Sequence, residues 1–403
     1  MKKKVLVITS SFPRYKTDWW AQFIANIYKN IDKQKYSITI LAPHAPSAKL
    51  EEFLDGIHII RFPYFYPFSL QKLTSGSGIL HSSKENFFAK MQIIFFVSMQ
   101  FLTTLKMLIK NKYDLVHIHW VIPQGLELLA AKYLFKIPVI ATVHGSDLFG
   151  LKKLNLFKKL VLENADLCTV NSSATQNEVL KIAPKTKTVF IPMGVNTKVF
   201  SSDKKSKKVK LNYDNANLIL AVGRLIGCKG FIYLIKAMPA ILKKFPNTKL
   251  LIVGSGPERQ NLENLVQKLG LPGYSVNFLG SVNHEELSRI YASSDIFVAP
   301  SITDPVTGET EGQGIVVLEA MASGIPVVGS ICGGIPDLIS HNEDGLLVKQ
   351  KDSKSLAMAI IKVMENKDLR DKFIKKGKLK IEKNYSWEKI GEKFTNIYTK
   401  ILE

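Results

Sequence analysis

Short apolar runs alternate with longer stretches of helical periodicity along the chain, and the whole series occurs twice. In the first half the runs are KVLVITS, SITILAP, DLVHIHW, IPVIATVHG, LCTVNS and VFIPMGV; in the second half they are NLILAVG, KLLIVGSG, VNFLG, IFVAPS and IPVVGS. Continuous apolar strands bounded by turn residues, with helices between them, are typical of parallel sheets covered on both faces. The pattern therefore predicts an α/β protein with two doubly wound parallel-sheet domains.

A polar, lysine-rich stretch separates the two series of runs. Residues 201–217, SSDKKSKKVKLNYDNAN, contain few apolar side chains, which suits a linker or an exposed connection. The length of 403 residues also fits two domains better than one core. We expect an N-terminal domain over 1–200, a C-terminal domain over 201–380, and a last helix over about 381–403. In that helix one side would hold Trp387, Ile390, Phe394, Ile397, Tyr398 and Ile401.

The composition narrows the classes of partner and compartment. The net charge is +21, from 55 Lys and Arg against 34 Asp and Glu. Such a balance favours polyanions or an anionic membrane surface, although a genome that prefers Lys, Ile and Asn codons produces the same excess. No zinc-finger spacing or aromatic–basic RNA motif appears, so we expect no nucleic acid partner. Three widely spaced cysteines match no disulfide or metal framework, which indicates a reducing compartment: Cys168, Cys228 and Cys332.

Two segments bear on membrane contact. The start, MKKKVLVITSSFPRY, has too short an apolar run for a signal peptide and is interpreted as a first strand. The longest apolar segment, Met91–Ile109, is interrupted by polar side chains, so we expect a buried or interfacial helix there and not a spanning one. The segment Leu151–Asp166 is predicted to be amphipathic. Together with residues 87–109 it is expected to lie against anionic lipid through Lys152, Lys153, Lys158 and Lys159. The alternative is that its leucines pack into the core and its lysines are solvated.

The segment AVGRLIGCKGFIYLIKAM carries two cations after a strand. The strand is expected to end at Gly223, and Arg224 and Lys229 follow before a helix that starts near Gly230. Cations at the carboxyl end of a strand, beside a helix N-terminus, form a site for a diphosphate. The alternative is a loop with two solvated charges.

The segment ETEGQGIVVLEAMASGIPVV, Glu309–Val328, combines glycines, which have no side chain, with the two acids Glu311 and Glu319. Gly312 and Gly314 allow close approach to the main chain. A helix is predicted over Ile315–Ser323 because Gly324 and Pro326 follow it. The amides of residues 312–316 would then point at an anion or at sugar oxygens.

The two acids of this segment would lie on either side of the helix start. Glu311 falls in the loop and Glu319 within the helix. A carboxylate accepts hydrogen bonds from vicinal hydroxyl groups, so Glu319 suits a ribose and Glu311 suits a sugar that is being moved. The alternative is that the two acids are only a surface residue and a partner of the helix dipole. For Glu319 this alternative is weak, because an acid in an apolar neighbourhood needs a partner.

The segment TVHGSD supplies a histidine from the first domain. His144 ends a predicted strand and Gly145 opens a turn, so the imidazole is expected to face a cleft between the domains. His117 and His119 alternate along the strand VHIHW and are interpreted as core residues. No carboxylate arrangement completes a metal site with them, so we expect no metal ion.

Taken together, these three segments resemble the retaining glycosyltransferases of family 4 (glycosyl transferases group 1), which have the GT-B fold of two Rossmann-like domains facing across a cleft. VGRLIGCKG resembles the phosphate loop of the family, EGQGIVVLE its pair of glutamates, and VHGSD its N-domain histidine motif. Residues 326–348 resemble the stretch that follows, and YSWEKI resembles the terminal helix that crosses back onto the first domain. The resemblance covers essentially the whole chain.

The resemblance implies transfer of a sugar from a UDP- or GDP-sugar to a hydroxyl acceptor, with retained configuration and without a metal ion or other cofactor. It implies catalytic roles for His144, Arg224, Lys229 and Glu311. It implies a donor site that contains Gly223, Arg224, Lys229, Gly312, Gln313, Gly314, Ile315 and Glu319. The acceptor would be a sugar or lipid-linked sugar in surface polysaccharide or glycolipid biosynthesis. The enzyme would be cytoplasmic, with a peripheral position on the inner face of the cytoplasmic membrane if it binds lipid.

One departure from the family pattern concerns the acceptor side. Many members carry paired glycines soon after the first strand, where this chain has SSFPRYKTDWWAQFI. Arg14 and Asp18 are the candidates to face the acceptor there. Two other classes stay open at this stage: a GT-B nucleotide-sugar epimerase or phosphorylase, and a non-catalytic relative that binds polyanions or membranes.

Overall fold

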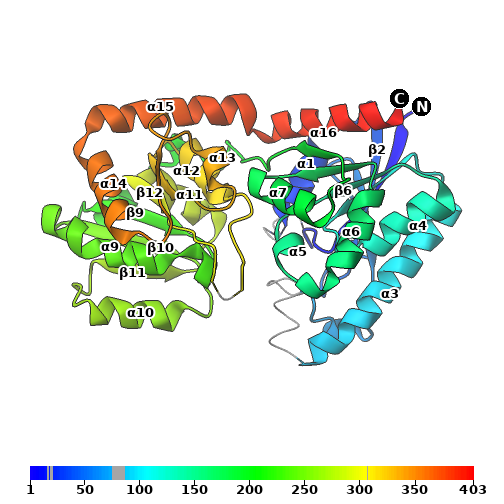
Figure 1. The fold of residues 1–403 in the computed structure, drawn as a ribbon, viewed down its shortest axis with the longest axis horizontal. Helices are drawn as coiled ribbons and strands as arrows, with labels where there is room; N and C mark the ends of the chain where they lie inside the picture. Colours follow the sequence, from blue (N-terminus) through cyan, green and yellow to red (C-terminus); the bar gives the residue numbers. More distant parts are fainter. Residues whose placement is uncertain (16–17, 19–20, 75–86, 306) are drawn as a thin grey trace. The chain divides into compact units, whose positions relative to one another are not determined.

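The computed structural model describes residues 1–15, 18, 21–74, 87–305 and 307–403. These residues form two compact α/β units, each with its own sheet covered by helices (Figure 1). Unit 1 comprises Met1–Asn171, Thr175–Ile191 and Ile390–Glu403; unit 2 comprises Ser172–Ala174 and Pro192–Lys389. The prediction of an α/β protein with two doubly wound parallel sheets is confirmed.

In the described part of unit 1, eight strands form one sheet in the order β3-β4-β2-β1-β5-β6-β7-β8. All neighbours are parallel except β3 and β4. The strands are β1 (Lys3–Ile8), β2 (Tyr36–Pro43), β3 (Glu51–Leu54), β4 (Ile57–Phe62), β5 (Leu115–His119), β6 (Val139–Thr142), β7 (Leu167–Val170) and β8 (Thr188–Phe190). The helices that accompany them are α1 (Gln22–Lys29), η1 (Phe68–Leu70), α3 (Phe87–Lys110), α4 (Gly125–Phe135), α5 (Ser146–Phe149), η2 (Lys152–Leu154), α6 (Asn155–Asn164) and α7 (Ser173–Ile182).

In the described part of unit 2, six parallel strands form a sheet in the order β11-β10-β9-β12-β13-β14. The strands are β9 (Asn217–Val222), β10 (Thr248–Val253), β11 (Val276–Gly280), β12 (Ile296–Ala299), β13 (Val327–Ser330) and β14 (Leu346–Val348). The helices are η3 (Ser202–Lys204), α8 (Lys207–Leu211), η4 (Gly227–Lys229), α9 (Phe231–Lys244), α10 (Arg259–Lys268), α11 (His284–Ser293), α12 (Ile315–Ala322), α13 (Ile335–Leu338), α14 (Ser353–Glu365) and α15 (Lys367–Asn384).

The central strands of unit 2 are buried on both faces, as their continuous apolar sequences require. Along β9, Leu218 and Leu220 belong to one core cluster, with residues of α11 and α12. Ile219 and Ala221 belong to the cluster on the opposite face, with residues of α9 and α14. Alternate residues of a strand point to opposite faces, so β9 holds two layers of helices together. The loops that follow β9 and β12 leave the sheet at its carboxyl edge, where ligands of such folds bind.

The borders between the units differ from the expected ones. The chain changes unit between Ile191 and Pro192, before the predicted boundary at residue 200. The lysine-rich stretch contains η3 and α8, which pack against α11, so it is part of unit 2 and not a bare linker.

The C-terminal segment also differs from its predicted span. Residues 381–384 still belong to α15, which packs on α12 in unit 2, and a new helix, α16 (Trp387–Leu402), begins after them. Only Ile390–Glu403 joins unit 1. There Ile390, Phe394 and Tyr398 are fully buried, as the periodicity predicts for one side of the helix.

Candidate active site

Two of the predicted catalytic residues meet at the carboxyl edge of the unit 2 sheet. Lys229 ends the η4 turn after β9, and Glu311 lies in the loop before α12. The ammonium group of Lys229 donates to Oε2 of Glu311 at 2.5 Å, and the hydroxyl group of Ser301 donates to the same oxygen at 3.3 Å. Both charged side chains are largely buried, with 19% and 11% of their surface exposed. Such a short, charge-assisted hydrogen bond holds the two side chains in a defined position.

Arg224 differs from Lys229 in having no such partner. Its side chain is exposed, and among the described residues no ion pair or hydrogen bond of its guanidinium group occurs. A guanidinium group binds phosphate oxygens through two parallel hydrogen bonds. The loop after β9 therefore presents one cation held by a carboxylate and one that is available to an anion.

Close backbone contacts fix the loop that holds Glu311. A Cβ atom added at Gly333 would lie 1.9 Å from the carbonyl oxygen of Glu311. Gly333 also has φ of +53°, in the left-handed region that other residues rarely adopt. The loop after β13 thus supports the loop before α12 through backbone contact, which only glycine permits.

The helix α12 begins as predicted, directly after Gly314. Its observed span, Ile315–Ala322, ends one residue before the predicted Ser323, which caps the helix. The side chain of Gln313, which is expected to bind the nucleotide-sugar donor, is buried and uses its amide group on the backbone of Met193. It donates to the carbonyl oxygen of Met193 at 3.1 Å and accepts from its amide at 2.8 Å. The side chain of Gln313 therefore fixes the loop before α12 to Met193. Only the backbone of Gln313 is available to bind a nucleotide sugar.

Glu319 lies within α12 beside a buried tyrosine. The Tyr291 hydroxyl group, from α11, donates to Oε2 of Glu319 at 2.9 Å. Burial raises the pKa of Glu319 to about 7, and the hydrogen bond from Tyr291 opposes this shift. Within the described part of the chain no group donates to its Oε1 atom. That oxygen is free to accept from a ligand hydroxyl group, and the ribose role of Glu319 stays a prediction.

In unit 1, His144 lies directly after β6 in an aromatic surrounding. Its Nε2 atom is 3.0 Å from Nδ1 of His119, and the two rings stack. The rings of Phe23 and Trp120 pack at its other sides, with centroids 5.2 and 4.6 Å away. Burial lowers the pKa of His144 to about 3, so the imidazole is neutral and acts as a hydrogen-bonding group.

Behind His144 runs a chain of buried hydrogen bonds. The Tyr28 hydroxyl group lies 2.5 Å from Nε2 of His119 and 2.9 Å from Nδ1 of His117. The same His117 atom is 2.6 Å from the hydroxyl group of Tyr398, on α16. The two histidines are core residues, as interpreted from the sequence, and His119 also contacts the ring of His144. The tyrosines were missed, because Tyr398 and His117 are 281 residues apart in sequence.

The acceptor-side candidates pair with each other. Nε of Arg14 donates to Oδ2 of Asp18 at 2.7 Å, and Nη2 donates to Oδ1 at 3.1 Å. The hydrogen bond with Asp18 raises the pKa of Arg14. The rest of the predicted acceptor stretch, residues 16–17 and 19–20, lies outside the described residues.

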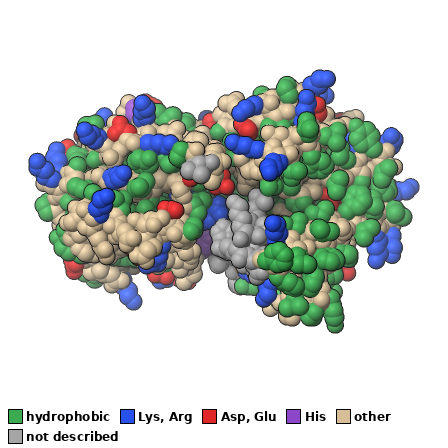
Figure 2. All heavy atoms as spheres, turned by 60° about the horizontal axis from the view of Figure 1, so that its bottom comes forward, with side chains coloured by type: hydrophobic (Ala, Val, Ile, Leu, Met, Phe, Trp, Pro, Cys, Tyr) green, Lys and Arg blue, Asp and Glu red, His purple; other side chains and the backbone are tan. Residues whose placement is uncertain are grey.

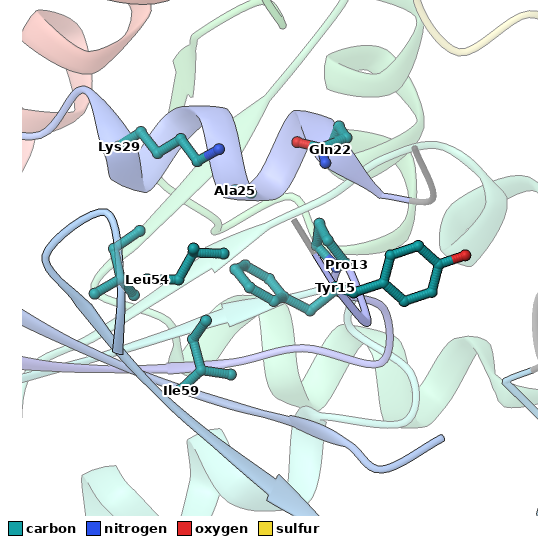
Figure 3. A pocket seen from close by; sticks show the side chains of 9 residues that line it. Pro13, Tyr15, Gln22, Ala25, Lys29, Leu54 and Ile59 are labelled. Atoms are coloured by element: carbon teal, nitrogen blue, oxygen red, sulfur yellow. The ribbon is translucent and has the colours of Figure 1, made fainter. Parts of the chain in front are cut away.

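A small hollow lies beside this pair, between α1 and the strands β3 and β4 (Figure 3). It is lined by Phe12, Pro13, Tyr15, Gln22, Ala25, Lys29, Leu54, Ile57 and Ile59. Gln22 and Lys29 are on α1 at one side, and Leu54 and Ile59 are on the strands opposite (Figure 3). Pro13 and Tyr15 flank Arg14, so the candidate pair adjoins a mainly apolar hollow.

Other chemistries find little support in the residues. In the ranges that the structure describes, no three side chains of His, Cys, Asp or Glu gather where they could hold a metal ion. Cys168, Cys228 and Cys332 are buried free thiols. Burial raises the pKa of Cys228, next to Lys229, to about 11, so this thiol is not activated by its neighbour.

Two parallel-sheet units, with a charged loop at the carboxyl edge of the second, define a GT-B protein. The fold is similar to that of HepE from Anabaena, whose structure contains UDP. The TM-score is 0.72 at 18% identity, over 98% of this chain and 100% of the other. At this identity the likeness shows the fold alone.

The family follows from the sequence comparisons. Residues 202–380 match the family "Glycosyl transferases group 1", and residues 21–199 match "Glycosyltransferase Family 4". An uncharacterized glycosyltransferase of Methanocaldococcus jannaschii is 34% identical over 313 residues, which are 73% of this chain and 77% of the relative. The chain belongs to the group 1, family 4 glycosyltransferases.

A further relative carries a specific name. The GDP-mannose-dependent alpha-(1-6)-phosphatidylinositol monomannoside mannosyltransferase of Mycobacterium tuberculosis is 27% identical over 265 residues, 64% of this chain and 68% of the relative. Across the first relatives the match spans between 48% and 77% of their own length. The family resemblance and the GT-B fold are confirmed, and the roles of the individual site residues stay predictions.

Proposed function

We propose that the protein is a retaining hexosyltransferase that moves a sugar from a nucleotide-diphosphate sugar to a hydroxyl group. The observation that carries this proposal is the loop pair in unit 2, where Lys229 meets Glu311 and Arg224 stays open. Cations at the carboxyl edge of a parallel sheet suit a diphosphate, and a carboxylate beside them suits sugar hydroxyl groups.

Arg224 and Lys229 would stabilise the charge that develops on the leaving diphosphate. This charge is largest in the transition state, so the interaction accelerates the reaction and does more than bind the donor. The contact with Glu311 keeps Lys229 in place before the donor arrives. When a phosphate oxygen accepts a hydrogen bond from the ammonium group of Lys229, Glu311 becomes free to accept one from a hydroxyl group of the donor sugar. These two cations would do this without a metal ion.

The anomeric configuration is retained if the bond to the phosphate breaks and the bond to the acceptor forms on the same face of the sugar. The bond from the anomeric carbon to the phosphate oxygen breaks while the acceptor oxygen bonds to the same face, and the acceptor proton passes to the departing phosphate oxygen. Glu311 then serves to orient the sugar and is not a covalent nucleophile. Glu319 would hold the ribose through its open oxygen, and the neutral His144 would act as a hydrogen-bonding group for a sugar hydroxyl group.

Two donor classes and one acceptor class have support among the relatives. The Mycobacterium tuberculosis enzyme is named for GDP-mannose, and HepE was crystallised with UDP, so both GDP- and UDP-sugars are donor candidates. The same mycobacterial name describes an acceptor sugar carried on a lipid. We therefore propose a sugar or lipid-linked sugar acceptor, in surface polysaccharide or glycolipid biosynthesis at the cytoplasmic side of a membrane.

The proposal is tested by NMR on donor consumption and product configuration. The enzyme is mixed with UDP- and GDP-hexoses and an octyl glycoside acceptor, with and without EDTA. We expect one nucleotide class to be consumed, EDTA to have no effect, and the anomeric proton of the product to show the donor's configuration. An inverted product, or no consumption of either class, would contradict the proposal.

A further inference from the structure

Helix α3 buries several polar side chains and exposes several large apolar ones. Gln100 and Thr104 are fully buried, whereas Ile94, Leu102 and Ile109 are 74%, 57% and 73% exposed. A surface helix of a water-soluble domain usually keeps its large apolar side chains on the core side, so those on the outer side of α3 are unusual. The outer side of α3 is therefore built for surroundings other than water.

The inner side of α3 contains unpaired polar atoms. Oε1 of Gln100 and Oγ1 of Thr104 are buried without a hydrogen-bond partner among the described residues. Burying unpaired polar atoms is unfavourable, and exposing large apolar side chains is unfavourable as well. A partner that covers the outer side would remove the second of these costs, the exposure of the apolar side chains.

The helix cannot leave unit 1 to meet that partner. By length and composition alone, Lys90–Lys110 could cross a membrane, and one third of the stretch, 33%, is buried. Phe96, Met107 and Leu108, however, belong to the core of unit 1 together with residues of β1 and β5. These anchors lie along most of the helix, so α3 stays along the surface of the unit.

Neighbouring helices extend the apolar surface. Helix α3 contacts α4, and α4 contacts α6. Hydrophobic side chains gather on this unit in the space-filling view, with lysine and arginine at their margin (Figure 2). We call the following exposed residues of α3, α4, η2 and α6 the apolar face: Phe87, Met91, Ile94, Phe95, Leu102, Ile109, Tyr133, Leu134, Leu154, Leu156 and Leu160.

The charge on these elements identifies the partner. The acidic residues of these elements are not exposed: Glu127 of α4 is buried and Glu163 of α6 is half-buried. The exposed charges of α3, η2 and α6 are lysines, namely Lys90, Lys106, Lys110, Lys152, Lys153 and Lys159. A second copy of this face would set these cations against one another. An anionic bilayer instead offers headgroups to the lysines and acyl chains to the apolar side chains. We propose that the apolar face docks unit 1 on an anionic lipid bilayer.

One expected lysine does not belong to this surface. Lys158 is fully buried, and its ammonium group donates to the carbonyl oxygens of Leu148 and Gly150 at 2.9 and 2.5 Å. The expectation that it contacts lipid is therefore wrong, because its long side chain turns inward to close the end of α5. A lysine variant must spare Lys158 to keep the fold intact.

Vesicle flotation of the full chain tests the proposal. The proposed lipid binding goes beyond the proposed function, because flotation measures it without a sugar donor or acceptor. Vesicles of phosphatidylcholine, with and without phosphatidylglycerol, are compared. The double variant Ile94→Gln, Leu102→Gln replaces outward side chains only, and Met358→Gln, Leu379→Gln is its matched control on exposed positions of unit 2. Lys152→Ala, Lys153→Ala, Lys159→Ala tests the charge.

We expect the wild type to float with anionic vesicles, the apolar double variant to partition at least tenfold less, and the control to match the wild type. The lysine variant should lose binding mainly to anionic vesicles at low salt, because salt screens this attraction. A wild type that floats with neither vesicle, or an apolar variant that floats like the wild type, would overturn the proposal. A dimer that Ile94→Gln, Leu102→Gln converts to a monomer would assign the face to a second copy and overturn it too.

Discussion

Replacing Lys229 by alanine is expected to lower kcat by about 100- to 1000-fold, the loss usual for one group that stabilises charge only in the transition state. The side chain is held 2.5 Å from Glu311, so its position is already set when the donor binds. The variant also leaves a largely buried carboxylate at Glu311 without its cation. The double variant Lys229→Ala, Glu311→Ala should therefore be less impaired than the product of the two single losses.

The matched control for this prediction is Lys244→Ala. Lys244 also pairs with a glutamate in unit 2, Glu365, but both side chains are about half exposed. Exposed pairs contribute little, about 0–1 kcal/mol, so its kcat and Tm should match those of the wild type. Steady-state kinetics with the donor that the enzyme consumes provide the comparison. A Lys229→Ala enzyme that keeps a third or more of the wild-type kcat would remove this residue from the mechanism.

Gly333→Ala is expected to destabilise unit 2 and to disturb the donor site together. The added Cβ would lie 1.9 Å from the carbonyl oxygen of Glu311, so the loop that holds Glu311 must move. Left-handed backbone adds about 1–2 kcal/mol of strain at a residue other than glycine, and overpacking adds about 1–3 kcal/mol. Thermal unfolding and donor kinetics on the same preparation should show a lower Tm and a lower kcat/KM.

Gly270→Ala distinguishes the effect of left-handed strain on Tm from the effect of the clash with Glu311. Gly270 has φ of +61°, close to the +53° of Gly333, but nothing lies within 4 Å of its added Cβ. It should show the conformational strain alone, with unchanged kinetics. Equal losses of Tm in the two variants, with kcat/KM intact in both, would mean that the loop after β13 does not support Glu311.

Local signals in the sequence predicted most of the strands, but the apolar runs did not include β3, β4 and β14. The span of α12 follows from Gly314 before it and Gly324 after it, and the observed helix differs from the predicted one only at Ser323. The contact between Lys229 and Glu311, across 82 residues, could be placed at one sheet edge only through the parallel topology.

Side-chain direction was less predictable than helix position. Periodicity shows which residues share one side of a helix, but not which side faces the core. For α3 the buried side holds Gln100 and Thr104 beside the core residue Phe96, while Ile94 and Leu102 are exposed. Periodicity does not predict this distribution. Lys158 cannot be told from the neighbouring lysines in the sequence. Its side chain points inward because its ammonium group donates to a carbonyl group at the end of α5. Gln313 likewise turned to Met193, in a distant segment.

The most direct test of the central claim, a nucleotide-diphosphate donor site in unit 2, is a thermal-shift titration. UDP, GDP and their sugars are added to the wild type, to Arg224→Ala and to Glu319→Ala. A ligand at 100 times its Kd stabilises the folded state by about 2.7 kcal/mol, a readily measured rise in Tm. We predict that one nucleotide raises the Tm of the wild type and of neither variant. No response to any nucleotide, or equal responses in all three proteins, would contradict the assignment of this site.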